Sequence, residues 1–142
     1  MLEKQVQAII NNKYPLITNL SNASAILNTM ENINWAGFYI VKEDGLYLGP
    51  FQGEVACSFI PFDKGICGRC YRTKAPVIID DVLKEKDHIA CSNASRSEIV
   101  VPIFKEDKVV ALIDIDAPIR SRFDKEDEKE LVLVASILGS LF

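Results

Sequence analysis

The stretch SEIVVPIFKEDKVVALIDID, residues 97–116, decides the fold class of this chain. It contains two runs rich in Val and Ile, 97–104 and 108–116, separated by the polar triplet KED at 105–107. Val and Ile favour extended backbone, and a short polar break between two such runs is typical of a β-hairpin. The stretch therefore predicts an antiparallel pair of strands.

Further extended runs precede this hairpin. The runs 35–41 and 46–51 flank the turn-forming triplet EDG at 43–45, which indicates a second hairpin. Shorter strand candidates lie at 55–61 and 77–79. Together these runs predict an antiparallel sheet of about six strands.

Helical periodicity appears at both ends of the chain. Apolar residues recur at helical spacing in 2–13, in 19–31 and in the segment that follows Asp124, a candidate N-cap. A short helix is also predicted at 66–73, before Pro76. These elements predict an α+β sandwich in which the N- and C-terminal helices pack on one face of the sheet. Their apolar stripes could also support a homodimer.

Length and composition set limits on the kind of protein. A chain of 142 residues, 49% of them apolar, is expected to form one domain, residues 1–142, with one core. The net charge is −4 and Lys and Arg form no long block, so nucleic acid is not an expected partner. The start MLEKQV lacks the apolar run of a signal peptide, and no apolar stretch approaches the roughly 18 residues that span a bilayer. We therefore expect a cytoplasmic protein with no membrane partner.

Strand alternation places two carboxylates on the same face of 108–116. Like charges held close oppose each other's ionisation, so Asp114 and Asp116 require a cation, a donor or water. They could lie in solvent at a fraying strand end, or form a small acidic pocket that binds an ammonium group or shares a proton. The two predicted faces are Val109, Ala111, Ile113 and Ile115 on one side, and Val110, Leu112, Asp114 and Asp116 on the other.

The run 35–41 places Trp35, Gly37 and Tyr39 on one face of its strand. Because glycine has no side chain, we expect an open notch between the two rings. These aromatics could be ordinary core, or they could form the seat of a small ligand that carries a methyl group and an amine.

Four cysteines, Cys57, Cys67, Cys70 and Cys91, lie within residues 57–91 and are the first candidates for chemistry. In a reducing compartment, clustered cysteines indicate a metal site or redox catalysis. Cys67 and Cys70 have C-x-x-C spacing, and His88 with Cys91 could complete a zinc site, although the usual second tight pair is missing. A thioredoxin-like motif, a cycle with attacking and resolving thiols, and ordinary buried cysteines are the other interpretations.

Several short blocks stand out along the chain. They are NWAGFY at 34–39, LGPFQG at 48–53, VAC at 55–57, GICG at 65–68, HIAC at 88–91, SEIVVPI at 97–103, LIDID at 112–116 and FDKEDE at 123–128. These blocks closely resemble the free methionine-(R)-sulfoxide reductases, which are stand-alone GAF-domain enzymes. The match runs in order from about residue 34 to residue 127. The thiols in these contexts, together with SEIV and DID, distinguish the reductases from sensory GAF domains.

This resemblance implies a role for each matching residue. Cys91 would be the attacking cysteine, and Cys57 and Cys67 the resolving ones, with Cys67 as first partner. Cys70 has no counterpart in the family pattern. Trp35 and Tyr39 would form the walls of the substrate pocket, and its acidic floor would consist of Glu98, Asp114 and Asp116.

The resemblance also implies the reaction. The protein would reduce free methionine-(R)-sulfoxide through a cysteine sulfenic acid and an intramolecular disulfide, and thioredoxin would recycle it as a defence against oxidative stress. No metal or organic cofactor is expected. A crowded set of carboxyls would keep one proton near neutral pH and supply it to the sulfoxide oxygen. The alternative is a GAF module that binds a small ligand as a sensor and consumes no thiols.

Overall fold

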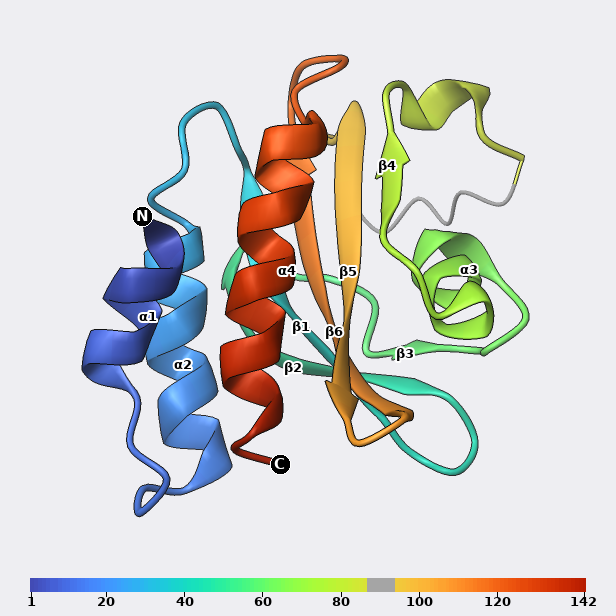
Figure 1. Ribbon diagram of the computed structural model, residues 1–142. Helices are drawn as coiled ribbons and strands as arrows, with labels where there is room; N and C mark the ends of the chain where they lie inside the picture. The colour runs from blue at the N-terminus through green and yellow to red at the C-terminus, as the bar shows by residue number, and fades with distance from the viewer. Residues whose placement is uncertain (87–93) are drawn as a thin grey trace.

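The computed structural model describes residues 1–86 and 94–142, and within these residues one antiparallel sheet of six strands forms the centre (Figure 1). Its strand order is β3-β2-β1-β6-β5-β4, and every neighbouring pair is antiparallel. Both predicted hairpins are therefore present. The strands are β1 (Trp35–Val41), β2 (Leu46–Gly53), β3 (Phe59–Ile60), β4 (Val77–Ile79), β5 (Ser97–Lys105) and β6 (Lys108–Ala117).

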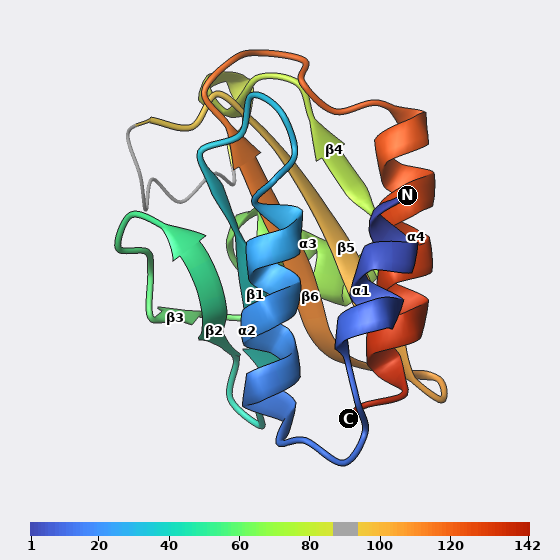
Figure 2. The ribbon, with the colours of Figure 1, turned by 90° about the vertical axis from the view of Figure 1, so that its left-hand side faces the viewer.

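Helices from the two ends of the chain share one face of this sheet, and a helix from the middle covers the other (Figures 1 and 2). This arrangement confirms the predicted α+β sandwich. None of the described helices is long and apolar enough to cross a membrane. The terminal layer consists of α1 (Leu2–Ile9), α2 (Leu16–Leu27) and α4 (Lys125–Gly139); the opposite face carries α3 (Gly65–Thr73), and a 3-10 turn, η1 (Val82–Lys84), follows β4.

The first two helices differ from their predicted bounds. Helix α1 ends at Ile9 rather than at residue 13, and α2 begins at Leu16, directly after Pro15. The buried side chain of Asn19 accepts a hydrogen bond from the Asn11 N–H at 3.0 Å and donates one to the Asn11 carbonyl at 2.9 Å. This pair of bonds uses the backbone groups that a longer helix would need, and it stabilises the turn between α1 and α2.

Helix α4 begins where the sequence predicts. Asp124 caps it, because its side chain accepts a hydrogen bond from the Asp127 N–H at 2.9 Å. The Asp127 carboxylate in turn accepts one from the Asp124 N–H at 3.0 Å, which completes a capping box.

Side-chain alternation divides the buried residues into two clusters. Ala36 and Phe38 of β1 pack under the terminal helices, whereas Trp35 and Tyr39 face α3. In β6 the predicted faces hold from Ala111 onward, but the predictions for Val109 and Val110 are wrong. Val109 packs with the α3-side cluster, and Val110 packs against the cluster under the terminal helices. The pairing explains the change: Ile103 lies opposite Ala111 and Phe104 opposite Val109, so Val110 is the extra residue of a bulge.

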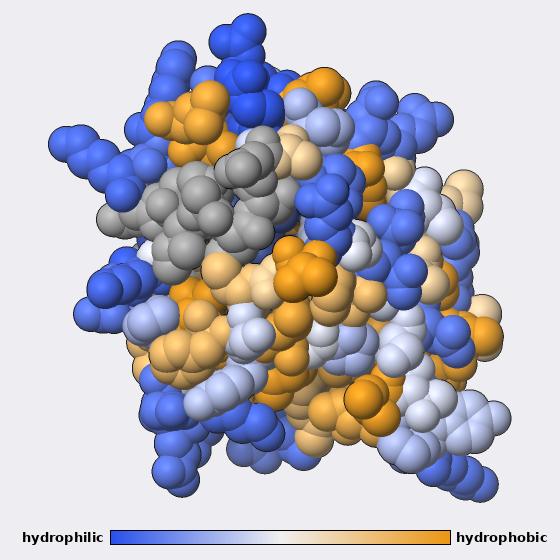
Figure 3. All heavy atoms as spheres, turned by 180° about the vertical axis from the view of Figure 1, so that it is seen from behind, coloured by the Kyte–Doolittle hydropathy of each residue, from blue (hydrophilic) through white to orange (hydrophobic). Residues whose placement is uncertain are grey.

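The strand predicted at 55–61 is mostly absent. Only Phe59–Ile60 pairs with β2, and residues 54–58 form an irregular segment that connects β2 to β3. The edge of the sheet near this segment exposes apolar side chains, including Tyr47, Val55 and Phe59. Figure 3 shows apolar side chains gathered over the middle of the side turned away in Figure 1.

Candidate active site

Cross-strand register brings three acidic side chains together on the α3 side of the sheet. Asp116 of β6 lies opposite Glu98 of β5 and also opposite Trp35 of β1. Asp114, two residues earlier on β6, lies opposite Gly37. Glu98 and Asp114 are buried, with exposed fractions of 7% and 6%, and Asp116 is partly buried. The structure thus excludes the interpretation in which these aspartates lie in solvent at a fraying strand end.

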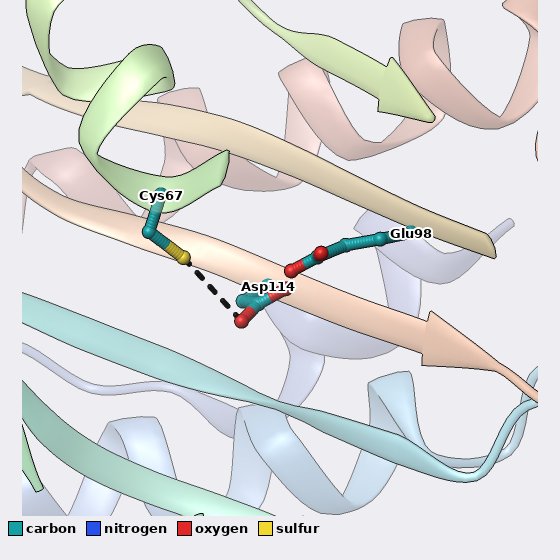
Figure 4. Close-up of side chains that lie close together, drawn as sticks. All are labelled: Cys67, Glu98 and Asp114. Atoms are coloured by element: carbon teal, nitrogen blue, oxygen red, sulfur yellow. Dashed lines mark hydrogen bonds between the residues drawn. The ribbon is translucent and has the colours of Figure 1, made fainter. Parts of the chain in front are cut away.

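Helix α3 places a thiol on this acidic group. Its first turn contains Cys67, whose Sγ donates a hydrogen bond to Asp114 Oδ2 at 3.4 Å. Figure 4 shows Cys67 pointing from α3 toward Asp114, while Glu98 approaches the same point from β5. Cys67 is itself buried, so the contact lies away from bulk solvent.

Burial and mutual repulsion change the protonation of the carboxyl groups. The pKa of Glu98 is raised well above its usual value, first by burial and then by the charges of Asp114 and Asp116. The pKa of Asp116 is also raised, by burial and then by Asp114, although hydrogen bonds from Glu98 and Ser95 oppose this shift. These groups titrate together, and the arrangement favours at least one retained proton near neutral pH.

The same environment keeps the two buried thiols neutral. Burial raises the pKa of Cys67, and the nearby charges of Asp114 and Glu98 raise it further. Burial, followed by the charge of Asp114, raises the pKa of Cys70 to about 12. Because the thiolate is the nucleophile, neither thiol is suited to a first attack on a substrate.

The other two cysteines differ from this pair. Cys57 is half-buried in the segment 54–58 and is disulfide-bonded, whereas Cys67 and Cys70 are free. Cys91, predicted to attack, and His88, its predicted neighbour, lie outside the described residues. Their roles therefore stay predictions.

Stacked aromatic rings form one wall of the site. The Trp35 ring stacks on Tyr39 with centroids 6.2 Å apart and on Phe51 with centroids 5.2 Å apart. The open notch expected at Gly37 is absent, because a Cβ at this position would lie 2.3 Å from Phe51 Cβ and 2.9 Å from Trp35 Cη2. The rings fill this space. Sequence reasoning missed Phe51, because a hairpin register counted from the turn places Pro50 opposite Gly37. The register shift between Gly37 and Tyr39 brings Phe51 there instead.

Both predicted wall residues are also hydrogen-bond donors to the segment that contains Cys57. Trp35 Nε1–H donates to the Glu54 carbonyl at 3.0 Å, and the Tyr39 hydroxyl donates to the Cys57 carbonyl at 2.9 Å. The aromatic wall is thereby connected to one of the candidate redox thiols.

One group of side chains could bind a metal ion. Cys67, Glu98 and Asp114 each offer a ligand atom, and these atoms lie within 4.8 Å of one another. Within the described part of the chain, Cys70 is not part of this group, and His88 and Cys91, the other two ligands of the zinc interpretation, lie outside the described residues. Glu98 also forms hydrogen bonds with the carboxyl groups of Asp114 and Asp116, and carboxyl groups bonded in this way can share a proton.

The thioredoxin-like interpretation is wrong, because an antiparallel sheet contains no βαβ unit.

Comparisons with known proteins agree with this geometry. The family described as GAF domain matches residues 23–142. The free methionine-R-sulfoxide reductase of Escherichia coli (strain K12) is 40% identical over 131 residues, which cover 92% of this chain and 79% of that protein.

Solved structures give the same result. The fRMsr of Staphylococcus aureus in its reduced form has a TM-score of 0.93 at 45% identity, covering 99% of this chain and 92% of that chain. The free methionine-R-sulfoxide reductase from Neisseria meningitidis, solved in complex with its substrate, has a TM-score of 0.90 at 38% identity. The match covers 99% of this chain and 83% of that chain.

Proposed function

Because this chain belongs to the GAF-domain family and, within it, to the free methionine-R-sulfoxide reductases, we propose that it reduces free methionine-(R)-sulfoxide to methionine by a cycle of cysteine chemistry. The observation that carries the proposal is the acidic group of Glu98, Asp114 and Asp116. Asp116 lies opposite Trp35, and Asp114 accepts a hydrogen bond from Cys67. Such a group provides a proton and a negative charge at one place, and a sulfoxide amino acid requires both.

The substrate would be bound by the two sides of this site. The Trp35 face, extended by Tyr39, would pack against the S-methyl group, and an ionised carboxylate would bind the α-ammonium group. A buried acidic floor supports a preference for the free amino acid, because a peptide-bound residue has no ammonium group to offer. The peptide chain on either side of such a residue would also collide with the walls of the site.

The retained proton would assist the chemical step. Oxide is a poor leaving group, so a protonated carboxyl near the sulfoxide oxygen would donate as a thiolate attacks sulfur. The raised pKa of Glu98, caused first by burial, supports it as the donor. The net first step transfers one oxygen atom, because thiol plus sulfoxide gives sulfide plus cysteine sulfenic acid.

Cys91 is the proposed attacking residue. The neutral state of Cys67 and Cys70 supports this choice among the four cysteines. A second thiol would then attack the sulfenic sulfur, and the hydroxyl group would leave with the thiol proton as water. Cys57 and Cys67 are the proposed resolving residues. The disulfide at Cys57 supports Cys57, rather than Cys67, as the first of them.

A dithiol protein would close the cycle. We propose thioredoxin, which would reduce the disulfide and become oxidised itself, so that the enzyme returns to its thiol form. In this role the protein would recover methionine after oxidative stress.

The test mixes reduced protein with free methionine-(R)-sulfoxide and counts methionine and thiols in the same sample. We expect two thiols lost per methionine formed, and no methionine from Cys91→Ser. Cys70→Ser is the matched control and should retain the reaction, while the (S)-sulfoxide should give none. Binding of the sulfoxide without thiol loss would instead indicate a ligand-binding sensor module.

A further inference from the structure

The segment 54–58, which contains Cys57, belongs to no helix and to no strand. Its ends are anchored by the sheet. Gly53, the last residue of β2, precedes it, and the Ser58 carbonyl accepts a hydrogen bond from the Leu48 N–H at 3.0 Å. Between these anchors the side chain of Val55 is 87% exposed, whereas Ala56 and Cys57 are partly buried against the cluster on the α3 side.

Two donors from the aromatic wall hold the interior of this segment. Trp35 Nε1–H binds the Glu54 carbonyl at 3.0 Å and the Tyr39 hydroxyl binds the Cys57 carbonyl at 2.9 Å. Both donors come from β1, in the middle of the sheet, and both side chains are at most 3% exposed. A buried donor without a partner is costly, so these bonds are expected to persist.

The start of the segment is shaped around the same indole. Gly53 has a φ of +135°, and a Cβ there would lie 2.5 Å from Trp35 Cδ1 and 2.9 Å from the Asn34 carbonyl oxygen. Only glycine allows the chain to turn this closely against the ring. The backbone from Gly53 to Cys57 is therefore held by the aromatic wall at three places: at Gly53, at the Glu54 carbonyl and at the Cys57 carbonyl.

We propose that Tyr39, assisted by Trp35, is a positioning residue that holds Cys57 where its sulfur forms and keeps a disulfide. Cys57 is the disulfide-bonded cysteine of the segment, and the Tyr39 hydroxyl binds its backbone directly. Holding the backbone lowers the entropy that a flexible segment would lose when the bond forms, which raises the effective concentration of the thiol.

In the reaction, and resting on the proposed function, Tyr39 has a part in two steps. The ring that would contact the substrate also holds the residue that would resolve the sulfenic acid, so the pocket wall connects the two chemical steps. Burial raises the pKa of the Tyr39 hydroxyl, so it remains a protonated donor over the working pH range.

The first experiment does not depend on methionine sulfoxide. The protein is equilibrated with mixtures of reduced and oxidised glutathione, in which one protein disulfide and two glutathione thiols give two protein thiols and one glutathione disulfide. Mass spectrometry after thiol labelling gives the oxidised fraction at Cys57. We expect Tyr39→Phe to shift this equilibrium roughly two- to tenfold toward the reduced protein, the range for loss of one hydrogen bond.

Tyr47→Phe is the matched control. It removes the same atom from a hydroxyl that binds Asp44 at 2.9 Å, outside the site, and should leave the equilibrium unchanged. Equal equilibria for Tyr39→Phe and wild type would overturn the proposal. If Tyr39→Phe does not fold, Trp35→Phe, which removes the donor to Glu54, is measured in its place with the same expected direction.

A second experiment separates the steps of the reaction. After one addition of sulfoxide, methionine release and disulfide formation are followed in the same sample, with a sulfenic-acid probe to trap the intermediate. In Tyr39→Phe the rate of disulfide formation should fall more than the rate of methionine release, and the amount of trapped sulfenic acid should increase. Wild-type protein that loses no thiols here would contradict the proposed function, while the glutathione result would still decide the role of Tyr39.

Discussion

At the scale of single residues, the acidic group of Glu98, Asp114 and Asp116 carries less negative charge than three carboxyl groups suggest. Glu98 and Asp116 both have raised pKa values, caused first by burial, so protons replace the cations that a charged cluster would need. The ion pairs of Arg69 with Glu85 and of Arg96 with Asp81 lie elsewhere.

The first prediction concerns stability as a function of pH. A carboxyl whose pKa is higher in the folded than in the unfolded state favours folding at low pH, and this contribution is lost as pH rises above the unfolded value. The free energy of unfolding should therefore fall as the pH rises above about 4.5, the ordinary value for a glutamate, and this fall should be smaller in Glu98→Gln. Urea denaturation at several pH values measures it. Glu43→Gln in the exposed turn is the control, and an equal fall in both variants would contradict the prediction.

The second prediction separates activity from folding. Asp116→Asn keeps the shape of the side chain but removes its charge and its part in the shared proton. We expect kcat/KM to fall roughly a hundredfold or more, the usual scale of general acid catalysis, with little change in the thermal midpoint. Asp107→Asn, in the turn between β5 and β6, should leave both unchanged. A large drop in the thermal midpoint together with the loss of kcat/KM would instead indicate a structural role for Asp116.

At the scale of elements, the close approach of β1 and β2 determines the shape of the aromatic wall. Gly37 lies opposite Phe51, and the rings of Trp35 and Phe51 cover the space above it. The two strands pack too closely here for any side chain at position 37.

The third prediction tests this packing. In Gly37→Ala the new Cβ would lie 2.3 Å from Phe51 Cβ and 2.9 Å from its Cα, so strand backbone must shift. We expect a loss of about 1–3 kcal/mol in the free energy of unfolding, as for other overpacked cores. Gly49→Ala is the control, because its nearest neighbour is Ile40 Cγ1 at 3.1 Å, an atom of a flexible side chain. Equal losses at both positions would show that the Phe51 contact is not the cause.

At the scale of the whole molecule, one sheet serves two purposes. The face under α1, α2 and α4 is a continuous apolar core, and the face under α3 contains the carboxyls, the rings and the buried thiols. Helix α4 also exposes apolar side chains on its outer surface, with Val132 at 42% and Leu133 at 50%. The homodimer expected from the terminal helices stays a prediction.

The fourth prediction addresses that homodimer. If α4 contributes to a contact between two copies, Leu133→Lys should weaken the dimer more than tenfold, because burying a leucine contributes about 1.5–3 kcal/mol. Sedimentation at several concentrations measures the dissociation constant. Val55→Lys changes an exposed apolar residue of the segment 54–58 and should have no effect. Wild-type protein that is monomeric at every concentration tested would contradict the predicted homodimer.

Local patterns in the sequence predicted much of this molecule. Alternation in 35–41 and 111–116 assigned side chains to the correct faces, and Asp124 marked the start of α4, because these patterns depend only on neighbouring residues. Resemblance to a family added Glu98 to the two aspartates. Tertiary structure alone decided the bulge at Val110, the filled space above Gly37, and the hydrogen bonds from Trp35 and Tyr39 to the Cys57 segment. These features depend on register and on contacts between distant segments, which no local period encodes.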